Sequence, residues 1–156
     1  MDSPATQGYA NSVRTLGIDV GERRVGLALS DPSGTLATPL GKVPASADLT
    51  EGVVAVGREI ERLMAEDDGL AGIVVGVPLS LDGRPNKQTK QAMAFVEALR
   101  RQTVLPIVLQ DERLTSREAE SRLALREKDW RRRKGRLDAA AAAIILQDYL
   151  DACEQF

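Results

Sequence analysis

The chain has 156 residues, which suits a single α/β domain with one core and requires no disulfide or structural metal. Its one cysteine excludes an intrachain disulfide, and the complete lack of histidine excludes Ser-His and Cys-His catalytic pairs and nearly all zinc chemistry. Because the chain has no histidine, any catalysis must rest on carboxylates, lysine, hydroxyls or a hard metal held by oxygen ligands. Its net charge is −2.

Residues 1–14 are polar and have neither the basic region nor the apolar region of a secretory signal, so we expect a flexible tail. Residues 15–156 are expected to form one domain. No apolar run approaches the ~20 residues that span a bilayer. These features predict a soluble, cytoplasmic protein without a membrane partner.

The first part of the domain is predicted to be a β-hairpin over residues 15–31. Apolar residues alternate there with Gly17, Asp19 and Gly21, and the second half repeats the alternation around Gly26. A third strand over residues 36–43 follows a turn.

The middle of the chain alternates between helix and strand. Helices are expected over residues 49–66 and 88–101, and apolar strands over 72–79 and 106–110. The first helix should bury Val53, Val56, Ile60, Leu63 and Met64. The second should bury Ala92, Phe95, Val96 and Leu99.

The last part of the chain is expected to be helical around a basic loop. Thr115 and Glu118 form a capping-box pattern that begins one helix, and an alanine-rich helix follows over residues 137–153. The complete order, β-β-β-α-β-α-β-α-α, predicts a five-stranded mixed sheet with its first three strands antiparallel and helices on both faces.

The basic loop, residues 126–136, reads REKDWRRRKGR. It holds seven basic and two acidic residues, a local charge of +5. Such a run is either a solvated loop or a patch that grips a nucleic-acid backbone. On the second interpretation, the candidate nucleic-acid-binding residues are Arg113, Arg131, Arg132, Arg133 and Lys134.

Three places in the sequence offer carboxylates for chemistry. Asp19 has glycines as its same-face neighbours, so a substrate or metal could approach it closely. Asp111 and Glu112 end an apolar strand, where ligand-binding residues of α/β sheets gather, and Asp138 begins the alanine-rich helix. Each also has an ordinary structural explanation: a strand-end turn for Asp19, helix-start electrostatics for the pair, and an N-cap for Asp138.

Taken together, four segments resemble the YqgF/RuvX family. They are TLGIDVGERRVGLALSDPSGTLATPL, IVVGVPLSLDG, PIVLQDERLTSREAE and LDAAAAAIILQDYLD, and they occur in the family's order. The resemblance implies an RNase H-like fold and phosphodiester hydrolysis with Mg²⁺ or Mn²⁺ held by Asp19, an acid of Asp111-Glu112-Arg113, and Asp138.

The chain departs from the related RuvC resolvases at the end of the fourth strand. Those proteins carry a glutamate there, whereas this segment reads Val75-Gly76-Val77-Pro78. The third carboxylate must then come from the fifth strand. Strand parity alone does not decide between its acids. We choose Glu112 over Asp111, since it lies nearer the strand's exit and its longer side chain can span the gap left by the missing acid.

The resemblance predicts a cytoplasmic nuclease that processes the 5′ end of pre-16S rRNA during ribosome biogenesis. Its partners would be RNA, branched DNA or pre-ribosomal particles, and it would act as a monomer or homodimer. One alternative is a DNA endonuclease that resembles Holliday junction resolvases. A second is a non-catalytic RNA- or ribosome-binding module. A third, the actin/hexokinase ATPase fold, requires two such domains, and one is predicted here.

Overall fold

The structure is a computed structural model that describes residues 13–45, 49–112 and 137–154. Its strands are β1 (Arg14–Val20), β2 (Arg24–Ser30), β3 (Ala37–Pro44), β4 (Leu70–Val77) and β5 (Ile107–Asp111). Its helices, within the same residues, are α2 (Thr50–Ala65), α3 (Lys87–Arg100) and α5 (Leu137–Glu154).

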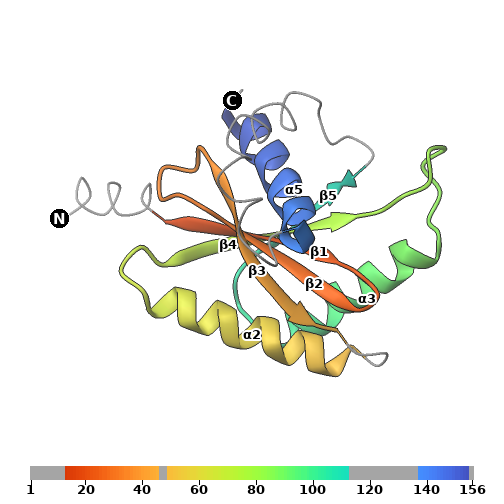
Figure 1. The fold of residues 1–156 in the computed structure, drawn as a ribbon, viewed down its shortest axis with the longest axis horizontal. Coiled ribbons are helices and arrows are strands. Elements are labelled where there is room, and N and C mark those ends of the chain that lie inside the picture. Colours follow the sequence, from red (N-terminus) through yellow and green to blue (C-terminus); the bar gives the residue numbers. More distant parts are fainter. Residues whose placement is uncertain (1–12, 46–48, 113–136, 155–156) are drawn as a thin grey trace.

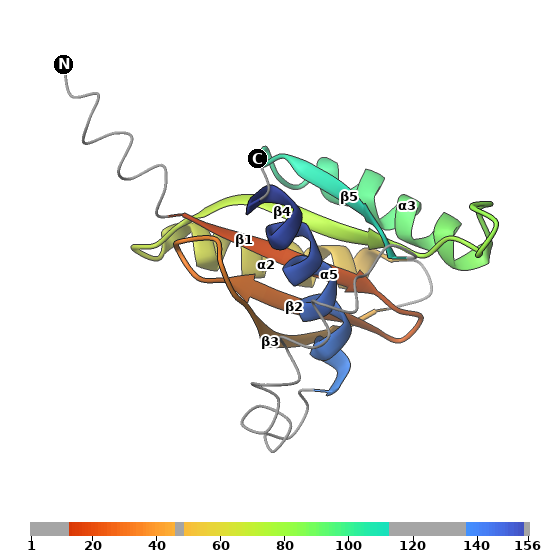
Figure 2. The ribbon, with the colours of Figure 1, turned by 90° about the horizontal axis from the view of Figure 1, so that it is seen from above.

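The strands form one five-stranded sheet in the order β3-β2-β1-β4-β5. β2 pairs antiparallel with both β1 and β3, whereas β4 pairs parallel with both β1 and β5. Helices α2 and α3 cover one face of the sheet, and α5 crosses the other (Figure 1, Figure 2). The predicted mixed sheet with helices on both faces is confirmed.

The larger core lies between the sheet and helices α2 and α3. The four residues expected to face inward from α3 are all fully buried, with Phe95 the largest of them. The expectation for α2 holds for four of its five residues and is wrong for Met64, which is 44% exposed. Met64 lies in the last turn of α2 and lines a hollow together with residues at and after the end of α3, so its side chain remains open to solvent.

The smaller core, between the sheet and α5, is built from small residues. Ala28 and Ala37 on the sheet meet Ala142 and Ala143 of the helix. A Cβ atom added to Gly17 would lie 2.7 Å from Leu146 Cβ and 3.1 Å from the carbonyl oxygen of Ala142. The α5 backbone therefore lies directly against β1, at a distance that only glycine allows.

Polar side chains link α5 to the start of β3, and the start of β1 to the end of α2. Gln147 of α5 is fully buried, accepts a 2.9 Å hydrogen bond from the Ala37 N–H, and donates one of 2.9 Å to the Thr35 carbonyl. Arg14 donates to the Gly69 carbonyl at 3.0 Å and pairs with Glu66 at 2.9 Å. The first strand therefore begins at Arg14, one residue before the predicted start of the domain.

Element ends differ from the prediction by up to two residues. β4 begins and ends two residues earlier than predicted, and the carbonyl of Pro78, the first residue after it, accepts a hydrogen bond from the Thr89 hydroxyl of α3. Helix α3 begins after Asn86, whose side chain accepts the Thr89 N–H at 3.0 Å in a capping box that the sequence reading missed.

The helix expected to begin at Thr115 and the basic loop, residues 126–136, lie outside the described residues. Within the described part of the chain, no helix is both long and apolar enough to cross a membrane.

We predict that Gly17→Ala destabilises the protein by about 1–3 kcal/mol, because the added methyl group has to displace the α5 backbone. Urea denaturation measures this free energy of unfolding. Gly57→Ala is the matched control: a Cβ there would lie no closer than 3.8 Å to any neighbour, and its helical site favours alanine by roughly 0.5–1 kcal/mol. Equal stability of the two variants would contradict the close approach of α5.

Candidate active site

The carboxyl ends of β1, β4 and β5 meet at one edge of the sheet because these three strands are parallel. Asp19 lies one residue before the end of β1 and is half-buried. It shares its face of the strand with Gly17, whose missing side chain is replaced by α5. Asp19 therefore lies on the α5 face of the sheet, at the edge where the sequence predicted a site.

Glu112 follows β5 directly, and its side chain extends across the end of β4. A Cβ atom added to Gly76 would lie 3.0 Å from Glu112 Cγ and 3.1 Å from Glu112 Cδ, and would collide with Ile145 of α5. The register aligns Ile18 with Val75, so Gly76 is the neighbour of Asp19 on β4. Glu112 thus reaches toward Asp19 over Gly76, which has no side chain to block it.

Burial makes both carboxylates harder to ionise. Burial raises the pKa of Asp19. Burial first, and then the negative charges of Asp19 and Asp111, raise the pKa of Glu112 to about 7. Asp19 raises the pKa of Glu112 because the two carboxylates are neighbours and their negative charges repel.

Asp111 points to the other side of the sheet. It pairs with Val77 on β4, whereas the adjacent residue Gln110 pairs with Gly76. Gln110 donates a 2.8 Å hydrogen bond to Asp148 of α5, which identifies its face as the α5 face. Asp111, on the opposite face, influences the site through its charge on Glu112.

Asp138 lies in the first turn of α5, but its side chain is outside what the structure describes, as are Arg113, Arg131, Arg132, Arg133 and Lys134. Among the described side chains, no group of three acids or other metal-binding residues comes together. The structure therefore brings Asp19 and Glu112 together, separates Asp111 from them, and describes nothing of the predicted basic interface.

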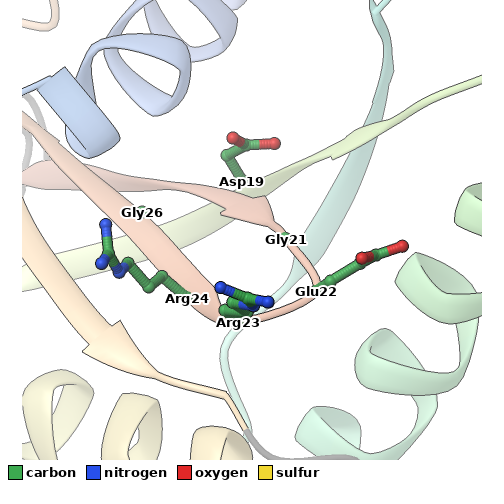
Figure 3. Close-up of a pocket in the computed structure, with 6 residues that line it drawn as sticks. All are labelled: Asp19, Gly21, Glu22, Arg23, Arg24 and Gly26. Atoms are coloured by element: carbon green, nitrogen blue, oxygen red, sulfur yellow. The ribbon is translucent and has the colours of Figure 1, made fainter.

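Two arginines that the sequence reading did not select lie next to Asp19. A hollow of about 330 Å³ is lined by Asp19, Gly21, Glu22, Arg23, Arg24 and Gly26. In Figure 3, Asp19 rises from β1 while Arg23 and Arg24 lie at the hairpin end of β2, and Glu22 points from the tip toward α3. The signal was present in the sequence, since two consecutive cations follow a carboxylate across a tight turn.

The sheet order, helix α5 across one face of the sheet and the paired carboxylates at the parallel strand ends are those of an RNase H-like protein of the nuclease type. Two solved resolvases share this fold. The Thermus thermophilus RuvC structure with a Holliday junction has a TM-score of 0.54 and 18% identity, and the comparison covers 91% of this chain and 96% of RuvC. A fowlpox virus resolvase bound to Holliday junction DNA has a TM-score of 0.55 at 9% identity, covering 90% of this chain and 99% of that one.

The sequence profile of the RuvX family, described as a Holliday junction resolvase, matches residues 13–152, and the chain belongs to this family. A protein of Chloroflexus aggregans is 42% identical over 142 residues, which cover 91% of this chain and 96% of the relative. One of an Anaeromyxobacter species is 43% identical over 142 residues, covering 89% and 97%. Both carry the name "Putative pre-16S rRNA nuclease". The predicted family is confirmed.

The raised pKa of Glu112 predicts a pH-dependent stability. The folded state holds this proton more tightly than the unfolded chain, where the carboxyl has its ordinary pKa of 4.5. Its contribution to stability is therefore complete below pH 4.5 and is lost as the pH rises to about 7. Glu112→Gln should raise the melting temperature of the cation-free protein by a few degrees at pH 8, and by much less at pH 5.

Thermal unfolding followed by circular dichroism in EDTA measures this difference. Glu61→Gln, an exposed position on α2, is the control for removing one negative charge, and it should show no such pH dependence. A Glu112→Gln melting temperature that stays equal to that of the wild type at pH 8 contradicts the prediction.

Proposed function

We propose that the chain is a divalent-metal-dependent nuclease that hydrolyses the phosphodiester backbone of RNA. The observation that carries this proposal is the Glu112 side chain, which lies over Gly76 beside Asp19 at the carboxyl ends of three strands. Two neighbouring carboxylates gain little from structure alone, because burial and mutual repulsion oppose their ionisation. Such an arrangement is typical of a cation site.

The residues that would hold the cation are Asp19, Glu112 and Asp138, with Asp111 as the weaker candidate. Their donors are all carboxylate oxygens, which suit Mg²⁺ or Mn²⁺. A cation bound there would relieve the repulsion that Asp19 exerts on Glu112, so the described pair fits such a group. When bound, it would supply Lewis-acid stabilisation of the phosphoryl charge and lower the pKa of water, chemistry that needs no histidine.

The protein's own contribution is to position these acids and to control their protons. Gly76 leaves space for Glu112, and the packed α5 face keeps Asp19 half-buried. Because carboxylates bind cations as anions, loss of the Glu112 proton accompanies binding. The affinity for the cation should therefore fall as the pH drops below about 7.

The proposed substrate is the 5′ end of pre-16S rRNA, processed in the cytoplasm within pre-ribosomal particles by a monomer or homodimer. The names of the relatives from Chloroflexus and Anaeromyxobacter support this choice. The second candidate is cleavage of four-way DNA junctions, supported by the family description and by the fold of the RuvC-type resolvases. The sequence of β4 argues against junction cleavage, because β4 has Gly76 where an acid would complete the pattern of the resolvases.

A non-catalytic RNA-binding module is less well supported than either nuclease. RNA is a polyanion, and a binding surface gains no affinity from two adjacent carboxylates.

We expect Asp19→Asn and Glu112→Gln each to leave a folded protein that binds RNA but cleaves it more than about 100-fold more slowly. Loss of a ligand should exceed the 10–100-fold effect of losing a residue that only supports a metal ligand. Asp111→Asn is the matched control, because it removes the adjacent charge from the opposite face, and it should mainly lower the melting temperature.

The measurement is cleavage in Mg²⁺ or Mn²⁺ of precursor rRNA, single strands, duplexes and four-way junctions, with metal titrations of all three variants. Near wild-type cleavage by Asp19→Asn would place the chemistry elsewhere. If the Asp111 variant loses metal binding and the Glu112 variant keeps it, the assignment of the third ligand is reversed. Preference for four-way junctions would select the resolvase candidate.

The basic loop, residues 126–136, is proposed to increase the affinity for RNA and to leave the rate of the chemical step unchanged. Neutralising Arg131, Arg132, Arg133 and Lys134 should flatten the dependence of RNA binding on salt, since each phosphate contact contributes about 0.7 to the slope on single strands. Single-turnover cleavage at saturating protein should change little. An unchanged salt slope would make the run a solvated loop.

A further inference from the structure

The α5 face of the sheet carries a row of residues that changes from acidic to basic at the edge where Asp19 lies. Asp19 on β1 pairs with Gly26 on β2, and Gly26 pairs with Lys42 on β3. Residues paired across neighbouring strands point to the same face, so Lys42 lies on the face of Asp19. Arg24 precedes Gly26 by two residues and shares that face as well.

Glycine separates the charges in this row. From β4 to β3 the row reads Gly76, Asp19, Gly26 and Lys42, and Glu112, which follows β5, extends its side chain over Gly76 at the β4 end of the row. Gly76 is covered by the Glu112 side chain, whereas Gly26 lines the hollow beside Asp19. At Gly76 the row brings the carboxylates of Asp19 and Glu112 together. At Gly26 it leaves a hollow between Asp19 and the basic residues.

The cations around this hollow are exposed. Arg23 and Arg24 line the hollow with Asp19 (Figure 3), and Lys42 lies on β3 beside Gly26, which also lines it. Two strand spacings, about 10 Å, separate the backbones of β1 and β3, and long basic side chains cover such a distance. Arg24 and Lys42 also make contacts within the chain, and both are exposed on the face of the sheet that carries Asp19.

The chemistry of this surface selects its ligand. Guanidinium groups present a planar fork that matches phosphate oxygens, and lysine adds a point charge. A nucleic-acid strand whose cleaved bond lies over Asp19 and Glu112 has further phosphates on either side of that bond. The hollow lies on the β2 side of Asp19, since its other lining residues belong to the β1–β2 turn and to β2.

We propose that three cations of the β1–β2 hairpin and of β3 bind backbone phosphates of the substrate strand immediately to one side of the cleaved bond. They are Arg23, Arg24 and Lys42, and they are called the hairpin cations below. This inference rests on the proposed nuclease function, and it assigns the β1–β2 hairpin and β3 a role in holding the strand that is independent of residues 126–136.

The first experiment measures binding alone. A fluorescent single-stranded RNA is titrated in EDTA at several KCl concentrations with the wild type and with Arg23→Gln/Arg24→Gln/Lys42→Gln. Three lost phosphate contacts should lower the salt slope by about 2 and weaken binding at 0.1 M salt by about 100-fold. Lys42→Gln alone, which leaves the hairpin intact, should lower the slope by about 0.7.

The matched control is Arg58→Gln/Arg100→Gln/Arg101→Gln. It makes the same change in net charge at exposed positions on α2 and at the end of α3, on the opposite side of the sheet. Its salt slope should stay that of the wild type. A hairpin-cation variant with the wild-type slope overturns the proposal, as does a control variant that loses as much slope, since net charge would then explain the effect.

The second experiment locates the contact. Single phosphates around the cut of a strand that the wild type cleaves are replaced by neutral methylphosphonates, and kcat/KM is measured for each strand. The wild type and the control should lose activity at one or two positions on one side of the cut. The hairpin-cation variant should be insensitive there, as a double-mutant cycle requires of contacting groups. Equal sensitivity of all three proteins overturns the proposal.

Failure of the proposed function looks different from failure of this inference. If the wild type cleaves no strand in Mg²⁺ or Mn²⁺, the nuclease function is wrong, and the salt slopes still decide whether the hairpin cations bind phosphate. If the wild type cleaves and both arms show no effect of the hairpin cations, the nuclease function stands and the phosphate site is wrong.

Discussion

The close approach of α5 to the sheet is the constraint on which the rest of the structure depends. Leu146 and the Ala142 carbonyl occupy the space over Gly17, and Ile145 occupies the space over Gly76. Any side chain on β4 at that point would have to compete with the helix. Glycine at this point of β4 leaves room for both the helix and the side chain of Glu112, which follows β5 and lies over Gly76 beside Asp19.

The same packing explains what could be predicted from the sequence. Hydrophobic periodicity gave the order of elements and the buried residues of α3, because these depend on local patterns. Parity could not choose between Asp111 and Glu112, because the sequence does not contain the register between strands. The structure supplies that register: Gln110 pairs with Gly76, which puts Glu112 on the face of Asp19. The prediction that Met64 is buried was wrong because the surroundings of this residue depend on where α3 ends.

Electrostatics oppose this arrangement in the protein alone. Burial raises the pKa of Asp19, and burial together with two neighbouring negative charges raises that of Glu112 to about 7. The fold thus holds two acids where each ionises less readily than in water, an arrangement common at functional sites. It resembles the strain stored at other active sites, since the stability of the surrounding structure is what maintains it. The buried small residues of the α5 face and the fully buried Gln147 are the parts of this chain that supply that stability.

The acidic and basic residues on the α5 face of the sheet lie on different strands. Along one face, the acids lie on β1 and after β5, and the cations lie on β2 and β3, with Gly26 between them. Contacts to phosphate position a nucleic acid but carry no information about its sequence. A row of this kind is consequently suited to RNA and DNA alike. The proposed phosphate contacts therefore do not choose between pre-16S rRNA, for which the relatives are named, and the DNA junction bound by the resolvase of the same fold, because both contain the same phosphodiester group.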